Sequence, residues 1–382
     1  MQWLANSIDE FFSGEEGLGS RNARFAWSLL VPTLAILILV AARPLEQTFI
    51  SSLTDDEFGT TRPARWVGLE NYQKLLSVRF VTVECQIDED TGECARTTGV
   101  QETIQWQRSD FEEEERQKFR EMPSEEREDY VRYEPAYTWQ LFGGETGLRV
   151  LAKDPIFIES FGNTIQFTFV SVLFELILGM IIALVVNSNF SGRGIMRTAM
   201  LVPWSIPTVV AAVLWQVMMR PDNTGIFNVL VQDLGLADSP VQWLTATGPW
   251  MYSIIAVDVW KTAPFMALLI LAGLQVIPKD IYEAAEVDGA GRIRQFFSIT
   301  LPLLRPTIAV ALIFRTLDAL RAFDVFQVLL DPTRPSMAYY NYDRLVLGRL
   351  DGFSSAVGVL IFIMILIFTV IYVRFVGIEQ EG

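Results

Sequence analysis

The sequence predicts an all-α polytopic membrane protein with six transmembrane helices. Of its 382 residues, 51% are hydrophobic, and they include 26 Phe and 10 Trp. These residues are gathered into runs of about 18 or more, long enough to cross the hydrocarbon layer as helices, rather than spread as in a soluble core. The loops between the runs alternate between basic and acidic character. The runs cover about 25–42, 161–186, 199–219, 250–276, 307–330 and 353–376.

Several function classes are excluded by what the sequence lacks. It has no histidine, which removes Ser-His-Asp and Cys-His catalysis, histidine-ligated metals and a histidine pH switch. It has no G-x-x-x-x-G-K-[ST] pattern, so any ATP that drives this protein binds to another subunit. No basic patch suggests binding to nucleic acid. We therefore expect neither a catalytic residue nor a metal site in this chain.

The N-terminal region combines a candidate amphipathic helix within 1–24 with a first transmembrane helix at 25–42. The polar face of the amphipathic segment is acidic, which favours packing on protein over binding to anionic lipid. A cleaved signal peptide, with Ala41-Ala42 near the cleavage point, is the alternative, although the apolar run is longer than a usual signal core. The apolar face is formed by Leu4, Ile8, Phe11 and Phe12.

The distribution of Lys and Arg predicts which loops are cytoplasmic. If six helices alternate in direction, the loops after the second and fourth spans lie on the same side as both chain ends. This side carries most of the basic residues, so the positive-inside rule makes it the cytoplasm. Both termini, with a tail at 377–382, are then cytoplasmic, and 43–160 is extracytoplasmic. The basic residues are Arg21, Arg24, Arg193, Arg197, Lys279, Arg292, Arg294, Arg305 and Arg374.

The loop between the fourth and fifth spans has a helix–turn–helix pattern. Ala284 and Ala285 leave the backbone of the first helix open to close approach by another protein. Gly289 can adopt the left-handed conformation that ends a helix. A second helix, over 292–304, then meets Pro302, which is expected to bend or stop it.

This loop resembles the EAA loop of permease subunits of binding-protein-dependent ABC importers. The spacing Glu-Ala-Ala, three residues, Gly, nine residues, Ile-x-Leu-Pro is met without a gap. The resemblance implies the six-helix ABC importer permease fold and a translocation function without enzymatic activity. It also implies a five-helix core over 161–376, whose cytoplasmic loop 279–304 couples to an ATPase. The implied coupling residues are Glu283, Ala284, Ala285, Asp288, Gly289, Ile299, Leu301 and Pro302.

Other stretches resemble carbohydrate-uptake permeases of the maltose and trehalose type, and in particular the first of two non-identical subunits. The likeness is carried by 260–265, 272–278 and 315–324. After Leu330 that subgroup usually has a glycine-rich turn, whereas this chain has Asp-Pro-Thr-Arg-Pro at 331–335. The implied substrate is a sugar or oligosaccharide. The implied partners are a second permease subunit, two ATP-binding subunits that hold Mg-ATP, an extracytoplasmic binding protein and membrane lipid.

A long segment separates two stretches that are nearly adjacent in that family. Residues 66–76 resemble the stretch after the first span and Asp154-Pro155 opens the next, so we interpret about 77–153 as an inserted extracytoplasmic domain. Within it, 84–134 holds 17 acidic and 7 basic residues. A partly disordered acidic loop is the alternative. The expected elements are strands at 81–83 and 103–106, a helix from the Ser109/Glu112 capping box to about Met122, and a helix after Ser124.

Both cysteines, Cys85 and Cys94, lie in this insert. On the oxidising side of the membrane, a hairpin disulfide between them is favoured over two free thiols. Asp88, Asp90 and Gly92 faintly resemble a calcium loop, but the third acidic ligand and the distal glutamate are absent, so no metal is expected there.

Ionisable residues at bilayer depth are costly and are therefore functional candidates. The run Arg315, Asp318, Arg321 and Asp324 alternates in sign at three-residue spacing and predicts ion pairs along the fifth span. Two interpretations stay open, a self-neutralised ladder and a group that contacts substrate. Nearby Gln and Trp favour contact, since amides, carboxylates and aromatic faces hold sugars. The substrate-pathway candidates are Gln166, Glu175, Trp215, Gln216, Asp258, Trp260, Lys261, Arg315, Asp318, Arg321, Asp324 and Gln327.

Prolines and small residues in the spans predict kinks and close packing. Pro203, Pro207 and Pro264 free backbone carbonyls and are expected to kink their helices. The pairs Gly179-x-x-x-Ala183 and Ala263-x-x-x-Ala267 allow helices to approach closely.

Two other function classes compete with an importer subunit. A secondary transporter would use Glu175 and Asp258 for ion coupling, but it predicts matching inverted halves, and the sequence has none. An intramembrane enzyme is disfavoured because histidine and a clustered metal-ligand motif are absent.

Overall fold

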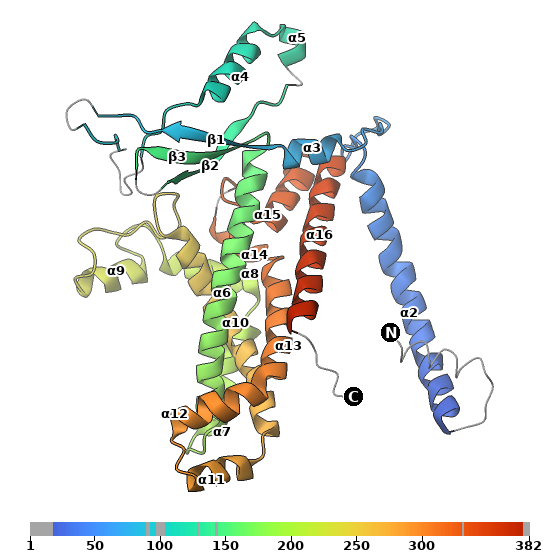
Figure 1. Cartoon of the computed structure of the whole chain (residues 1–382), viewed down its shortest axis with the longest axis vertical. Helices are drawn as coiled ribbons and strands as arrows, with labels where there is room; N and C mark the ends of the chain where they lie inside the picture. Colours follow the sequence, from blue (N-terminus) through green and yellow to red (C-terminus); the bar gives the residue numbers. More distant parts are fainter. Residues whose placement is uncertain are drawn as a thin grey trace.

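The computed structural model of the protein describes residues 18–88, 92–96, 104–127, 130–141, 144–330 and 332–376. Figure 1 shows a bundle of long helices, with a small sheet and α4 and α5 at one end and α11 and α12 at the other. Most of the predicted N-terminal amphipathic helix and the tail at 377–382 lie outside the described residues.

The elements follow one another mostly as helices. Within the described residues, five helices are long and apolar enough to cross a membrane, and the bent pair α7 and α8 makes a sixth if it is counted as one span. The helices of the bundle are α2 (Leu18–Ser51), α3 (Glu70–Leu76), α6 (Pro155–Asn187), α7 (Arg193–Ser205), α8 (Thr208–Met218), α9 (Ile226–Asp233), α10 (Trp250–Val276), α11 (Lys279–Val287), α12 (Arg292–Gln295), α13 (Leu301–Ala319), α14 (Asp324–Leu329), α15 (Met337–Tyr342) and α16 (Asp351–Val376).

The first span is longer than the predicted 25–42. Helix α2 continues past Pro44 to Ser51, because the apolar run marks only the part of a helix that crosses lipid and not its ends. Its lower part stands apart from the bundle in Figure 1. Near its C-terminal end, the Phe49 ring contacts the Phe362 ring of α16 edge to face, with 6.1 Å between centroids.

The predicted third span, 199–219, is broken rather than kinked. Helices α7 and α8 meet at an angle of 90°. Ile206, between them, has extended backbone (φ −75°, ψ 131°), as expected for the residue before a proline, here Pro207. In contrast, α7 continues through Pro203 and α10 through Pro264.

The predicted fifth span, 307–330, was wrong at both ends. The helix begins at Arg292 and ends at Ala319, and α14 follows after a short turn. Pro302 does not stop it. The helix passes from α12 to α13 through the π turn η1 (Phe296–Thr300), a wider turn that directly precedes Leu301 and Pro302.

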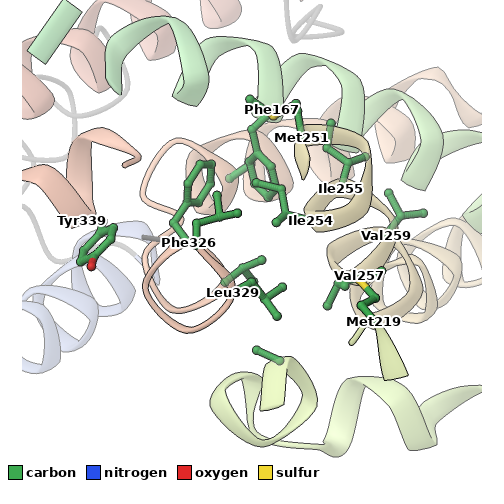
Figure 2. Packing of buried hydrophobic residues seen from close by; sticks show 14 of the residues in the cluster. Phe167, Met219, Met251, Ile254, Ile255, Val257, Val259, Phe326, Leu329 and Tyr339 are labelled. Atoms are coloured by element: carbon green, nitrogen blue, oxygen red, sulfur yellow. The ribbon is translucent and has the colours of Figure 1, made fainter. Parts of the chain in front are cut away.

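The core of the bundle lies where α6, α10 and α14 meet (Figure 2). Phe167 of α6 and Phe326 of α14, both fully buried, pack edge to face with centroids 5.1 Å apart. Lipid tails are as apolar as these side chains, so burial from lipid alone gives little driving force. Helices in a membrane are therefore held together by van der Waals contacts, which require them to approach closely. At Gly179 a Cβ would lie 2.8 Å from Met266 Cγ and 3.1 Å from Ala267 N. The close helix packing predicted from the small residues Gly179 and Ala267 is confirmed, and the structure shows that it joins α6 to α10.

The insert contains an antiparallel three-stranded sheet in the order β1-β3-β2. Its strands are β1 (Val78–Glu84), β2 (Glu134–Gln140) and β3 (Thr146–Ala152), with β3 in the centre. The predicted strand at 81–83 lies inside β1, whereas 104–106 forms only isolated bridges. The sequence analysis did not predict strands β2 and β3. Strand β2 contains Pro135 at a shift in register, and neither strand shows a clear alternation of apolar and polar residues.

The predicted capping box of the insert is confirmed. The Ser109 Oγ accepts from the Glu112 N–H, and the Glu112 carboxylate accepts from the Ser109 N–H at 2.8 Å. It opens α4 (Asp110–Glu121), and α5 (Ser124–Arg127) follows. Glu112 also pairs with buried Arg149 of β3 at 2.8 Å. This ion pair fixes α4 to the sheet.

Side chains also fix the base of the insert to the bundle. The Asp154 carboxylate caps α6 by accepting from the Phe157 N–H at 2.9 Å, and buried Tyr340 of α15 donates to its other oxygen. Tyr137 of β2 donates to the Glu159 carbonyl at 3.1 Å. Burial raises the pKa of Tyr137 to about 12, with a smaller contribution from nearby Glu159.

Candidate functional site

The first candidate site is the loop between α10 and α13, at the end of the bundle opposite the insert (Figure 1). Helix α11 ends in a paired hydrogen-bond motif. The Ala290 N–H donates to the Ala285 carbonyl at 2.9 Å and the Gly289 N–H to the Glu286 carbonyl at 3.0 Å. Gly289 has φ +76°, so the predicted left-handed turn is confirmed.

The residues expected to couple to a partner divide into two groups. Those of α11 and its turn lie on the outside of the loop: Glu283, Ala284, Asp288 and Gly289 are exposed, and Ala285 is half-buried. Ile299, Leu301 and Pro302 are half-buried where the loop enters the bundle, and Leu301 packs on a buried cluster of α6, α10 and α13. The loop therefore presents its first helix outward and anchors its second.

Large apolar side chains are also exposed on this loop. Val287 is 88% exposed and Ile293 is 78% exposed, on either side of the glycine turn. Helix α11 buries none of its side chains. Such a surface beside a short helix is suited to lie in another protein's groove.

The second candidate site is an ion-paired cluster inside the bundle. The Arg315 guanidinium of α13 donates from Nε and Nη2 to both oxygens of Glu175 in α6. It also donates from Nη2 to Asp258 of α10. Glu175 is fully buried and Arg315 is 2% exposed. One side chain thereby ties three membrane-spanning helices together.

Asp318 completes the cluster at its edge. Its carboxylate accepts from Arg315 Nη1 at 3.0 Å, and its side chain is 69% exposed. The predicted Arg315–Asp318 pair is therefore present. The predicted ladder is wrong beyond it, because α13 ends at Ala319 and leaves Arg321 in the following turn and Asp324 at the start of α14.

The electrostatics of the cluster are acidic, since one guanidinium faces three carboxylates. Bidentate hydrogen bonds between Arg and a carboxylate are strong because both groups are charged. A buried charge without a partner destabilises the folded state. Thr262 adds a polar contact, with its hydroxyl 2.6 Å from both a Glu175 carboxylate oxygen and the Asp258 carbonyl. The cluster can fix the relative positions of α6, α10 and α13 and can leave Asp318 available to a hydroxyl-bearing molecule.

The remaining pathway candidates are not drawn into the cluster. Lys261, half-buried, forms no hydrogen bond or ion pair with a residue in the described part of the chain. The Trp215 and Trp260 rings contact each other edge to face, with centroids 5.6 Å apart. Gln216 donates to the Val328 carbonyl at 3.0 Å. Gln166 is exposed, and Gln327 is half-buried on α14.

Sequence reasoning missed that Glu175 and Asp258 both accept hydrogen bonds from Arg315. Their similar depth in three different spans was the available signal, but depth does not give the direction in which a side chain points. Thr262 was also missed, although it lies one turn after Asp258 on α10 and so shares its face.

In the insert, a disulfide joins Cys85 and Cys94. Among the described residues, no group of three or more Cys, Asp or Glu side chains is arranged to hold a metal ion. Asp90, from the faint calcium pattern, lies outside those residues.

The fold and the two sites define a polytopic helical membrane protein with a charged internal core and an exposed loop that fits a partner protein. Residues 175–377, more than half of the chain, match the family described as binding-protein-dependent transport system inner membrane component. The chain belongs to this family. It is a permease, the transport component of an ABC importer, and ATP hydrolysis belongs to a separate subunit of such importers.

Individual relatives agree with this assignment. Over 233 residues, 59% of this chain and 77% of the relative, the chain is 45% identical to the trehalose/maltose transport system permease protein MalF of Thermococcus litoralis. It is 39% identical to the trehalose transport system permease protein SugA of Mycobacterium tuberculosis, over 57% of this chain and 70% of the relative.

Solved structures give the same fold. A bacterial alginate ABC transporter in complex with an alginate pentasaccharide-bound periplasmic protein superposes with a TM-score of 0.55 at 28% identity, over 60% of this chain and 81% of that chain. A bacterial ABC transporter involved in alginate import superposes with a TM-score of 0.63 at 20% identity, over 94% of this chain and 98% of that chain. Nothing in these relatives supports the ion-coupled alternative, and both of its acidic residues are bonded to Arg315.

Proposed function

We propose that this chain forms part of the translocation pathway for a sugar or oligosaccharide in an ATP-driven importer. The observation that carries the proposal is the 279–304 loop, a short exposed helix ended by a left-handed glycine and anchored in the bundle. Relatives named for trehalose, maltose and alginate support the carbohydrate class.

The proposed assembly contains a second permease subunit, two ATP-binding subunits that hold Mg-ATP and an extracytoplasmic substrate-binding protein. It lies in the cytoplasmic membrane of a bacterium or archaeon, with both termini of this chain in the cytoplasm. The basic residues near the 279–304 loop support that orientation. The insert, about 77–153, is then an extracytoplasmic domain, and its position at the opposite end of the bundle agrees with this (Figure 1).

Coupling in this proposal is mechanical. Helix α11 lies in a groove of an ATP-binding subunit, as an amphipathic helix lies in a cleft. When ATP closes the two ATP-binding subunits, the groove carries α11 with it, and the bundle rocks between inward-open and outward-open arrangements. Binding of the loaded binding protein outside and of ATP inside favour the same state, because such coupling is reciprocal.

The proposed contacts with substrate come from polar and aromatic side chains of the membrane-spanning bundle. Asp318 is the leading candidate, since one edge of its carboxylate is held by Arg315 and the rest is exposed. Trp215 and Trp260, whose rings contact each other, are the aromatic candidates. The other candidates are Gln166, Gln216, Lys261, Arg321, Asp324 and Gln327.

The test is reconstitution of the complete assembly in proteoliposomes. We expect import of radiolabelled trehalose or maltose that requires internal ATP and the external binding protein. Import driven by a sodium or proton gradient without ATP would overturn the proposal. Glu283→Arg should lower import and binding-protein-stimulated ATP hydrolysis together. Glu114→Arg, the same charge reversal at an exposed residue of α4 at the opposite end of the molecule, is the control and should leave both unchanged.

A further inference from the structure

We propose that Tyr282 is a positioning residue that sets the rotation of α11 about its own axis, and thus the face that the coupling loop presents. This inference rests on the proposed function of the 279–304 loop. Its basis is a hydrogen bond between the Tyr282 hydroxyl and Thr300 Oγ1, at 2.9 Å, which joins the two arms of the loop.

The chain itself fixes the ends of α11 but not its rotation. At one end, Ile277 and Pro278 connect it to α10, and at the other the glycine turn connects it to α12. Cluster packing of Leu274, Leu304 and Leu301 holds α10 against α13. Helix α11 therefore connects two helices that are packed against each other. Of its possible movements, rotation about its own axis is the one that these connections constrain least.

Packing opposes that rotation only weakly. Helix α11 buries none of its nine residues, and only Tyr282 and Ala285, three residues apart on one face, are half-buried. Ala285 has no side-chain group that could bond across the loop. Among the described residues, the bond from the Tyr282 hydroxyl is thus the side-chain hydrogen bond that links the middle of α11 to the second arm.

The other partner of this bond is rigidly held. Thr300 is 5% exposed and lies in η1, between α12 and α13. In addition, Gln295, also buried, donates from its side-chain amide to the Ala290 carbonyl at 2.9 Å and closes the turn on its own side. The bond from Tyr282 therefore ties α11 to a fixed point.

The fixed point lies on the helix that carries the charged cluster. One helical segment extends from Arg292 to Ala319 and contains both Thr300 and Arg315. At about 1.5 Å per residue, these two residues are roughly 22 Å apart along the axis. A displacement of α11 reaches this helix at Thr300 and passes along it to the cluster that ties α6 and α10.

Rotation decides which side chains a partner meets. Successive residues of a helix are about 100° apart, so a turn of one residue would replace Glu283 by a neighbour on the outer face. The net contribution of one such hydrogen bond corresponds to about a two- to tenfold preference for the bonded arrangement. Loss of the hydroxyl should therefore change coupling more than assembly.

The first experiment measures the loop itself and needs no partner. Spin labels are placed on Val287→Cys and Ile293→Cys, both strongly exposed, while the native cysteines are joined in a disulfide. We expect one narrow distance distribution in the purified chain and a broad or second one after Tyr282→Phe or Thr300→Val. Thr300→Ser keeps the hydroxyl and should restore the narrow distribution.

The second experiment measures sugar molecules imported per ATP hydrolysed in the reconstituted assembly. Tyr282→Phe and Thr300→Val should each lower this ratio about two- to tenfold, the double variant should be no worse than either, and co-purification with the ATP-binding subunits should persist. Tyr72→Phe is the matched control, since Tyr72 donates to Ser52 Oγ at 2.7 Å near the insert.

Either of two outcomes would overturn the inference: unchanged distances and ratio in Tyr282→Phe, or Thr300→Ser as defective as Thr300→Val. Failure of the proposed function has a different signature. In that case the unmodified chain itself would not associate with ATP-binding subunits, whereas the spin-label result would stand.

Discussion

The Arg315 guanidinium donates hydrogen bonds to both carboxylate oxygens of Glu175, although 140 residues separate the two in sequence. The bond joins α13 to α6, and Asp258 on α10 shares the same guanidinium. All three are buried, and Arg315 is the cation that hydrogen-bonds both acidic groups. A buried carboxylate that lost this partner would be left without its compensating charge.

The first prediction follows from this dependence. Arg315→Gln leaves two buried carboxylates without their cation, so the folded state should lose about 3–5 kcal/mol, the usual effect of breaking a buried ion pair from one side. Yield of membrane-inserted protein and thermal unfolding in detergent measure the loss. Arg321→Gln is the control, because Arg321 is exposed in the turn after α13. Equal melting temperatures for the two variants would contradict the structural role of Arg315.

Asp318 is predicted to behave differently from its buried neighbours. Asp318→Asn leaves Arg315 paired with Glu175 and Asp258, so expression should stay near normal. If the exposed carboxylate hydrogen-bonds a sugar hydroxyl, uptake per inserted protein should fall about ten- to hundredfold, the equivalent of one hydrogen bond to a charged group.

Arg315 cannot serve as the second member of a double variant with Asp318, because its loss also leaves Glu175 and Asp258 without a cation. Asp318→Asn alone separates the two interpretations. If Asp318 only neutralises Arg315, uptake per inserted protein should stay near normal, because the other two carboxylates still pair with the guanidinium. Unchanged uptake would remove Asp318 from the pathway.

The sequence predicted what local rules decide. Apolar run length located the membrane helices, a capping box located α4, and the glycine of the coupling loop has the expected positive φ. These features depend on residues that are close to one another in the sequence. The α7–α8 break and the end of α13 at Ala319 were not predicted, because a proline permits either a kink or a break and tertiary contacts decide between them.

The charged cluster shows why the candidate site was only partly predictable. Arg315 and Asp318 are three residues apart on one helix, so their pairing follows from helix geometry. Pairing with Glu175 and Asp258 depends on the rotation of α6 and α10, which side-chain packing such as that of Gly179 against Met266 determines. A single sequence carries no direct information about that rotation.

Gly289 gives a prediction for coupling. Valine at this position would be forced into the left-handed region, at a cost of about 1 kcal/mol or more, with no steric clash because the space around a Cβ there is open. Import and stimulated ATP hydrolysis should both fall while the protein still inserts. Gly291→Val is the matched control, since Gly291 has φ −69° and equally open surroundings. Full stimulated hydrolysis by Gly289→Val would rule out a role for this turn in coupling.

The last prediction concerns the insert and its place outside the membrane. Cys85 and Cys94 are joined in a disulfide, and Cys85 is buried beside the edge of β1. A maleimide that cannot cross membranes should therefore label the protein in intact cells only after mild reduction, and then at two thiols per chain. Substituting both cysteines by serine should abolish that labelling and, because the cross-link limits the unfolded chain, lower the stability of the insert by about 2–4 kcal/mol. Limited proteolysis of right-side-out vesicles measures the second effect through faster cleavage between β1 and β3. Labelling without reductant would show free thiols, and labelling confined to lysed cells would place the insert in the cytoplasm and reverse the proposed orientation.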